Sequence, residues 1–147
     1  MRYVYPVALA KDEDGEFVAT SRDVPEALTS GTTKSEALQA MSEALGAALA
    51  GYVLERQGIP APSTPAHGEY LVPVAALVAA KLALRAAMRD EGASDTELAR
   101  RLNISEGAVR RLLDMDHASR IDGVIAALSV LGAGLIIEDQ RQMVVAA

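Results

Sequence analysis

The stretch 94–114, SDTELARRLNISEGAVRRLLD, constrains the fold of this 147-residue chain more than any other part of it. Leu98 and Leu102 are one helical turn apart, so they share one face of a helix. Ser94, with Glu97 three residues later, forms a capping box, which predicts that a helix begins at this point. The pattern therefore predicts a short amphipathic helix with a defined start.

A second helix is predicted directly after a tight turn. Asn103 interrupts the apolar pattern and suits the left-handed conformation of a turn, and Ser105 is a favourable N-cap. Small Ala99 stands where two helices joined so closely must approach each other. The residues expected to face inward from the second helix are Ala108, Val109 and Leu112. This layout is that of a helix-turn-helix, whose second helix enters the major groove of DNA by its N-terminal end.

The outward face of this helix pair offers polar and charged groups to a nucleic acid. The candidates for contact with base edges are Ser105, Glu106, Gly107 and Arg110, with arginine suited to guanine and glutamate to cytosine. The candidates for contact with phosphates are Ser94, Thr96, Arg111 and His117. For His117, capping of the preceding helix end is an equal alternative. An ordinary pair of core helices is the alternative interpretation of the whole stretch.

Four arginines favour DNA binding over that alternative. Arg100, Arg101, Arg110 and Arg111 all fall on the polar faces, and arginine suits both phosphates and guanine edges. The stretch also resembles the helix-turn-helix of phage-repressor-like regulators. The residues that carry this resemblance are Leu98-Ala99, Asn103-Ile104-Ser105 and Val109-Arg110. The resemblance implies a DNA-binding unit at this end of the chain.

Composition limits the classes of function. The net charge of −6 argues against a protein that coats nucleic acid indiscriminately, so DNA binding must come from a local patch. The chain has no cysteine, which excludes disulfides and thiolate chemistry. Its start lacks the apolar core of a signal peptide, and its most apolar run, 71–80, is too short to span a bilayer. A cytoplasmic protein without a membrane partner is expected.

The residues before the helix pair predict a small α+β layer. Strands are predicted at 2–10, 16–20, 27–30 and 70–74, with Asp14-Gly15 as a hairpin turn. A helix is predicted from Lys34 to about Glu55, and the Pro-rich segment 57–68 is a loop or linker. The apolar stripe of that helix consists of Leu38, Met41, Leu45, Leu49 and Tyr52. One helix covers only one face of such a sheet, which leaves the other face for a partner.

The rest of the chain predicts an all-helical half. Helices are expected at 75–89 and 120–131, the latter capped by Ser119 and ended by Gly132 and Gly134. Residues 135–138 and 143–145 form a small hairpin or a frayed tail. Palindromic operators require a two-fold dimer, so a homodimer or a dimer of dimers is expected. The apolar helix 75–88 and the tail after Leu131 are the candidate dimer surfaces.

The order of these elements resembles that of HicB antitoxins with a C-terminal helix-turn-helix. In the first half the matching residues are Tyr3-Val4-Tyr5-Pro6 and the stretches 12–18, 23–27, 29–33, 35–38 and 43–45. In the second half they are the stretches 111–114, 120–122 and 126–128, together with His117, Ser119 and Leu131-Gly132. One corner departs from the family pattern, because Glu26 and Ala27 stand where the family has glycine and a small residue.

The resemblance implies two domains and a type II toxin–antitoxin system. A partial RNase H-like domain, 1–74, would cover the RNA-binding surface of a small mRNA-cleaving toxin of the HicA type. A helix-turn-helix domain, 75–147, would bind operator double-stranded DNA and repress the operon. Charge agrees with the first role, because residues 1–65 carry five basic and nine acidic side chains. The residues expected to contact the toxin are Asp12, Glu13, Asp14, Glu16, Asp23 and Glu26.

Catalysis is not expected of this chain. RNase H chemistry needs several carboxylates that converge on two metal ions, whereas Asp12, Glu13 and Asp14 are neighbours in one turn. No Gly-rich phosphate loop and no metal-ligand spacing is present in the sequence, so no cofactor is expected. Two other functions remain open: a stand-alone repressor with an N-terminal ligand- or protein-sensing domain, and an interaction module whose helices never touch DNA.

Overall fold

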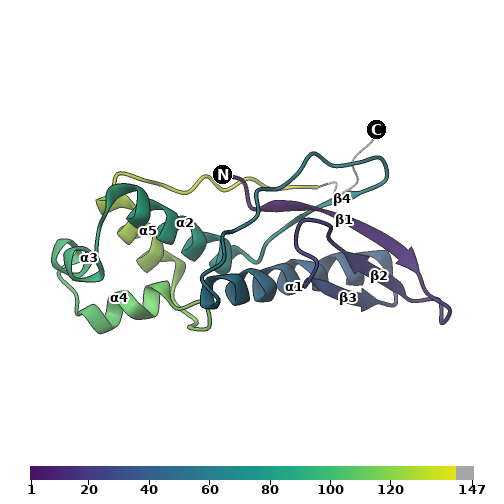
Figure 1. Cartoon of the computed structure of the whole chain (residues 1–147), viewed down its shortest axis with the longest axis horizontal. Coiled ribbons are helices and arrows are strands. Elements are labelled where there is room, and N and C mark those ends of the chain that lie inside the picture. The colour runs from purple at the N-terminus through teal and green to yellow at the C-terminus, as the bar shows by residue number, and fades with distance from the viewer. Residues whose placement is uncertain (142–147) are drawn as a thin grey trace. The chain divides into compact units, whose positions relative to one another are not determined.

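The computed structural model describes residues 1–141 of the chain and has the predicted α+β fold (Figure 1). Its elements are β1 (Val4–Lys11), β2 (Phe17–Thr20), β3 (Leu28–Gly31), α1 (Lys34–Leu54), β4 (Tyr70–Pro73), α2 (Ala76–Glu91), α3 (Asp95–Leu102), α4 (Glu106–Leu113) and α5 (Ile121–Val130). They form two compact units. An N-terminal unit comprises Met1–Ala75 and the stretch that begins at Asp139, and a C-terminal unit comprises Ala76–Glu138. The sequence alone places the division after residue 74 and assigns the whole tail to the second domain.

The N-terminal unit is built on a four-stranded antiparallel sheet in the order β3-β2-β1-β4. The first half of β1 pairs with β4, and its second half pairs with β2. The N–H of Val74 donates to the carbonyl of Tyr3 at 2.9 Å, so Tyr3 and Val74 form a hydrogen-bonded pair. In an antiparallel ladder every second pair is of this kind, which makes Val4–Pro73 and Pro6–Leu71 non-hydrogen-bonded pairs. Pro6 and Pro73 then fall at positions whose N–H would point out of the β1–β4 ladder. Neither proline therefore breaks a hydrogen bond between these two strands.

Helix α1 covers one face of the sheet, as the apolar stripe predicts. Thr33 caps the helix by accepting from the N–H of Glu36, and the Glu36 carboxylate accepts from the N–H of Thr32. Met41, Leu45 and Leu49 are fully buried. Within residues 1–141, α1 is the one helix long and apolar enough to cross a membrane. Its burial against β3, β2 and β4 accounts for that apolar character as a core helix.

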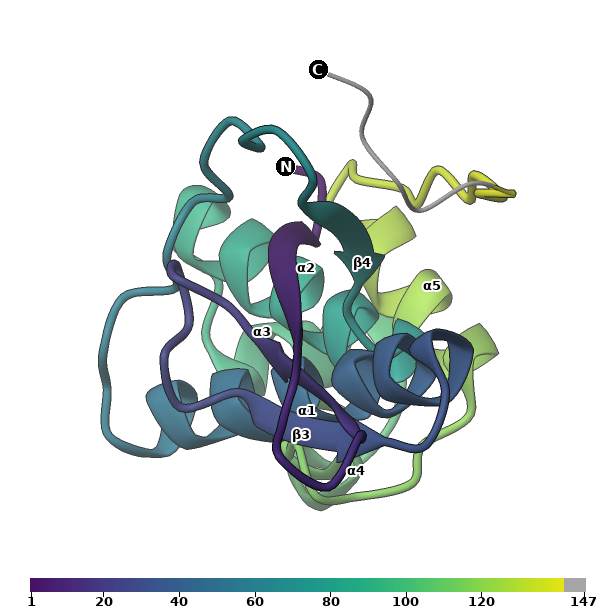
Figure 2. The same cartoon turned by 90° about the vertical axis from the view of Figure 1, so that its right-hand side faces the viewer.

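The Pro-rich segment is a loop fastened to the N-terminal unit rather than a linker between units (Figures 1 and 2). Arg22 donates to both carboxylate oxygens of Glu69, at 3.0 and 2.9 Å, and to the hydroxyl of Ser63. Asp23 accepts from the N–H and the hydroxyl of Ser63. The hydroxyl of buried Tyr5 donates to the carbonyl of Pro60 at 2.6 Å.

The Tyr5 bond predicts a loss of stability in alkali. Burial, as the largest cause, raises the pKa of Tyr5 from 10.0 to about 12. The contribution of Tyr5 to the free energy of unfolding is complete below pH 10 and is lost as the pH rises through 12. Between these values the Tyr5 hydroxyl ionises readily in the unfolded chain and not in the folded chain. Urea denaturation followed by circular dichroism should show a smaller alkaline loss for Tyr5→Phe, and a cost of about 1 kcal/mol at pH 7. An unchanged alkaline loss in the variant would contradict this account.

The C-terminal unit packs four helices around its own apolar core. Leu84, Leu98, Val109, Val124 and Ala127 are fully buried there. One predicted detail is wrong, and another lies only partly within the described residues. Helix α5 begins after Arg120 without a side-chain cap, because the Ser119 hydroxyl is bonded elsewhere. Residues 135–138 form no strand, and residues 143–145 lie outside the described residues.

Candidate nucleic-acid and partner-binding surfaces

Helices α3 and α4 are joined by the predicted tight turn. Ser94 accepts from the N–H of Glu97 at 3.1 Å, and Ser105 accepts from the N–H of Ala108 at 3.0 Å. Asn103 lies between the helices in the left-handed conformation, with φ 54° and ψ 46°. The N–H of Ile104 returns to the carbonyl of Ala99 at 3.1 Å, which closes the end of α3. These caps hold two eight-residue helices in a defined geometry.

The inward faces of the two helices differ in part from the prediction. Leu98, Ala99 and Val109 are buried, as expected. Leu113, rather than Leu112, completes the buried face of α4, since it lies four residues after Val109. Leu112 is only partly buried and lies against α5, where its Cδ2 is 3.2 Å from the position that a Cβ on Gly123 would take.

The start of α4 presents the residues predicted to contact bases. Ser105 and Glu106 are exposed, and the side chain of Arg110 is 65 % exposed. Glu106 accepts from the hydroxyl of Thr96 at 3.0 Å and lies 3.9 Å from Arg110. A Cβ on Gly107 would meet no atom closer than 3.7 Å. The structure therefore brings the four residues to one exposed helix start and adds Thr96 from α3.

The residues predicted to contact phosphates have different surroundings. Ser94 already serves as an N-cap, and Arg111 is exposed on α4. His117 lies in the connection between α4 and α5, with its ring Nδ1 2.9 Å from the hydroxyl oxygen of Ser119. The carbonyl of His117 also accepts a hydrogen bond from α2. The side chain is exposed and its backbone is fixed.

Two of the four arginines are paired within α3. Arg100 and Arg101 both bond to the carboxylate of Glu97, at 2.6 and 2.9 Å. The hydrogen bonds from Arg100 and then Arg101 lower the pKa of Glu97 from 4.5 to about 2. Glu97 therefore remains charged at neutral pH and screens both guanidinium groups. The positive charge of α4, on Arg110 and Arg111, is less neutralised than that of α3, because the nearest carboxylate oxygen of Glu106 is 3.9 Å from Arg110.

Two cations of α2, absent from the residues predicted above, hold the far end of α4. Lys81 is fully buried, and its ammonium donates to carbonyls of Arg111, Asp114 and His117. Arg85 donates to the carbonyl of Leu113 at 2.6 Å. A signal existed, because Lys81 lies four residues after Leu77 and three before Leu84, on the apolar face of its helix. A lone lysine at such a position indicates a buried polar contact.

The second surface is the sheet face that α1 leaves uncovered in the N-terminal unit. Paired residues of antiparallel strands point to the same side, so the register places Ala8, Thr20 and Leu28 in one row across this face. All three are exposed, and Leu28 is 63 % exposed. This row therefore places a large, exposed apolar side chain, Leu28, at the β3 edge of the face.

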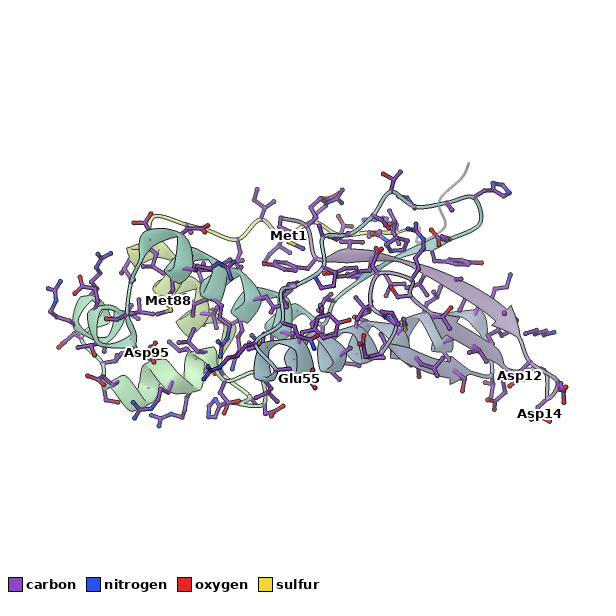
Figure 3. All side chains as sticks on the ribbon, viewed as in Figure 1. Met1, Asp12, Asp14, Glu55, Met88 and Asp95 are labelled. Carbon is purple, nitrogen blue, oxygen red and sulfur yellow. The ribbon has the colours of Figure 1, made fainter. Side chains whose placement is uncertain are left out.

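The acidic residues predicted to bind a toxin lie at two places. Asp12 and Asp14 project from the β1–β2 turn (Figure 3). Glu13 lies between them in the sequence, and Glu16 directly precedes β2. There Asp12 accepts from the N–H groups of Asp14 and Glu16, both at 2.9 Å. Asp23 and Glu26 belong to the connection at the opposite end of β2.

These last two carboxylates already have partners in the N-terminal unit. The side chain of Asp23 is 12 % exposed and fastens the Pro-rich loop through Ser63. Glu26 accepts from the hydroxyl of Tyr52, which lowers the pKa of the glutamate. The altered corner around Glu26 and Ala27 is thus fixed to α1 by this bond.

Comparison with known proteins assigns the chain to a family. Residues 4–83 match the family described as HicB_like antitoxin of bacterial toxin-antitoxin system. The chain is 40 % identical over 131 residues to Antitoxin HicB 2 of Photorhabdus laumondii, with 89 % of this chain and 92 % of that protein covered. It is 35 % identical over 131 residues to Antitoxin HicB of Escherichia coli K12, with 89 % and 95 % covered. The chain therefore belongs to the HicB-like antitoxin family.

Proposed function

We propose that the N-terminal unit neutralises a small RNA-cleaving toxin of the HicA type by binding over its RNA-contacting surface. The observation that carries this proposal is the uncovered sheet face, which ends at the acidic turn of Asp12, Glu13 and Asp14. A surface that binds RNA is basic, so an acidic turn beside an open face is complementary to it. The chain would act by occupying that surface in the cytoplasm, without catalysis of its own.

Co-expression tests this role directly. The basic toxin encoded beside an antitoxin should arrest growth when expressed alone, and this chain should restore growth. Neutralising the turn in the triple variant Asp12→Asn, Glu13→Gln and Asp14→Asn should weaken the purified complex more at low salt than at high salt. Glu43→Gln on α1 is the control, because it removes an exposed charge far along the chain from the turn. Full growth arrest despite expression of the folded wild-type chain would refute the proposal.

We further propose that α3 and α4 act as a helix-turn-helix that binds the operator and represses the operon. The exposed start of α4, with Glu106, Gly107 and Arg110, supports this proposal. Two copies in a homodimer, or four in a dimer of dimers, would read the halves of a palindrome. A duplex selected from a randomised pool should bind with an affinity that falls steeply with salt, whereas an interaction module that avoids DNA would select no duplex.

Gly107→Ala separates stability from DNA binding. The substitution should stabilise α4 by about 0.5–1 kcal/mol, because alanine favours a helix and the new Cβ meets no close atom. If the backbone of α4 approaches the DNA at this point, affinity for the selected duplex should fall about tenfold, or about 1.4 kcal/mol. Thermal unfolding and fluorescence anisotropy measure the two effects. Gly51→Ala on α1, where a Cβ meets no atom within 4 Å, should change stability alone.

A further inference from the structure

Helix α2 sends a buried cation, Lys81, to the end of α4 and the connection between α4 and α5, and core packing does not explain it. The ammonium of Lys81 lies 3.1 Å from the carbonyl oxygen of Arg111, and 2.6 Å from the carbonyl oxygens of both Asp114 and His117. It lies 2.9 Å from the hydroxyl oxygen of Ser119. The residue is fully buried, so every donor of this charged group is turned inward. The three N–H donors of this one side chain are thus shared among four acceptors between residues 111 and 119.

A second cation of α2 continues this arrangement. The guanidinium of Arg85 donates to the carbonyl of Leu113 through Nε at 3.0 Å and Nη2 at 2.6 Å. The last carbonyls of a helix have no partner within it, and they carry the negative end of the helix dipole. Helix α4 ends at Asp114 in an extended conformation, without a glycine cap. Lys81 and Arg85 therefore supply the missing donors and a favourable charge.

The Ser119 hydroxyl links this cluster to residues on the outer surface. It donates to the carbonyl of Arg111 at 3.1 Å and lies 2.9 Å from the ring of His117. Arg111 and His117 are two of the residues predicted to contact phosphates. The cluster thus fixes the backbone of these residues and the direction in which α4 leaves the core, although Lys81 itself cannot reach DNA.

We propose that Lys81 is a positioning residue for operator recognition, which sets the orientation of α4 through its bonds to the carbonyls of Arg111, Asp114 and His117. This inference rests on the proposed operator binding. Base contacts require that a helix lie in the groove within a fraction of an ångström, whereas binding to phosphates of any sequence tolerates a shift. Loss of the cluster should therefore reduce sequence discrimination more than it reduces general DNA affinity.

The test compares Lys81→Met with the wild-type chain on two duplexes of equal length, the selected operator and a random sequence. Methionine keeps the volume of the apolar stem and removes the donors. The ratio of the two affinities should fall at least tenfold, with the random-duplex affinity and its salt slope unchanged. Lys34→Met, which removes an exposed lysine from the N-terminal unit, should leave the ratio at the wild-type value. An unchanged ratio in folded Lys81→Met would overturn the proposal.

Amide hydrogen exchange without DNA separates this inference from the proposed function. In Lys81→Met, exchange should accelerate across 106–119 while the amides of α3 and α2 stay protected. If the wild-type chain binds no selected duplex, operator binding fails, and the positioning proposal falls with it even if exchange shows that Lys81 holds the segment. If exchange is unchanged while discrimination falls, Lys81 does not act through the orientation of α4, and the proposal is wrong.

Ser119→Ala keeps the proposal testable if Lys81→Met does not fold. It removes the hydroxyl from the cluster while three carbonyl partners of the ammonium remain. We expect a several-fold loss of the operator-to-random ratio with a thermal transition close to that of the wild type. A wild-type ratio in the folded Ser119→Ala variant, together with wild-type exchange across 106–119, would count against positioning by this cluster.

Discussion

Leu98→Ala is expected to unfold the C-terminal unit while the N-terminal unit remains folded. Leu98 is fully buried in the core of the C-terminal unit, and a buried Leu→Ala substitution costs about 2–5 kcal/mol. A unit of about sixty residues has roughly 3–9 kcal/mol of stability in total, so this cavity removes much of it. Operator binding should be lost, and neutralisation of the toxin should persist.

The tyrosines allow the two units to be followed separately. All four tyrosines lie at or before position 70, whereas 76–138 contains neither tyrosine nor tryptophan. In Leu98→Ala, far-ultraviolet circular dichroism should show an early helical transition, and tyrosine fluorescence should keep its wild-type midpoint. Leu45→Ala on α1 is the reciprocal control and should move the fluorescence midpoint. Coincident shifts of both signals in Leu98→Ala would mean that the units unfold together.

Arg110→Ala is expected to lower operator affinity by about 1–3 kcal/mol, a factor of roughly five to 150, with the loss concentrated at one base position. The side chain of Arg110 is 65 % exposed on α4, and the carboxylate of Glu106 lies 3.9 Å from its guanidinium. A guanidinium so weakly held is free to pair with a guanine edge. Binding to a panel of single-position operator variants measures the effect.

Arg100→Ala provides the matched control for this substitution. Its guanidinium is held by Glu97 at 2.6 Å, so its removal should change affinity far less and equally for all sequences. If Arg110→Ala instead weakens binding to every variant by the same factor, Arg110 contacts a phosphate. Its assignment as a base-reading residue would then be wrong.

Local signals in the sequence predicted most of the fold. The two serine caps, the left-handed Asn103 and the Asp14-Gly15 turn each act within a few residues, so their effect can be read without the tertiary structure. The stripe of α1 was predicted because burial follows the helical period. The cap of α5 was assigned wrongly, because Ser119 has a long-range partner in Lys81 that outweighs its local preference.

The contacts that define the two surfaces were harder to predict. Arg22 and Glu69 are 47 residues apart, and nothing near either residue indicates the other. The pairing of Thr96 with Glu106 depends on the angle between two helices, which the sequence of each helix does not specify. The acidic turn is visible in the sequence because its residues are adjacent, whereas nothing near Asp23 indicates its bond to Ser63, 40 residues later.

The placement of Pro73 in the edge strand β4 of the N-terminal sheet has a consequence for solubility. The outer edge of β4 would normally offer a row of donors and acceptors to which another chain can add. Pro73 lacks an N–H at that edge, and the carbonyl of Leu71 already accepts from the side chain of Gln140 at 2.7 Å. This edge is a poor template for cross-β stacking, so copies of the chain made before any partner arrives should resist aggregation through it.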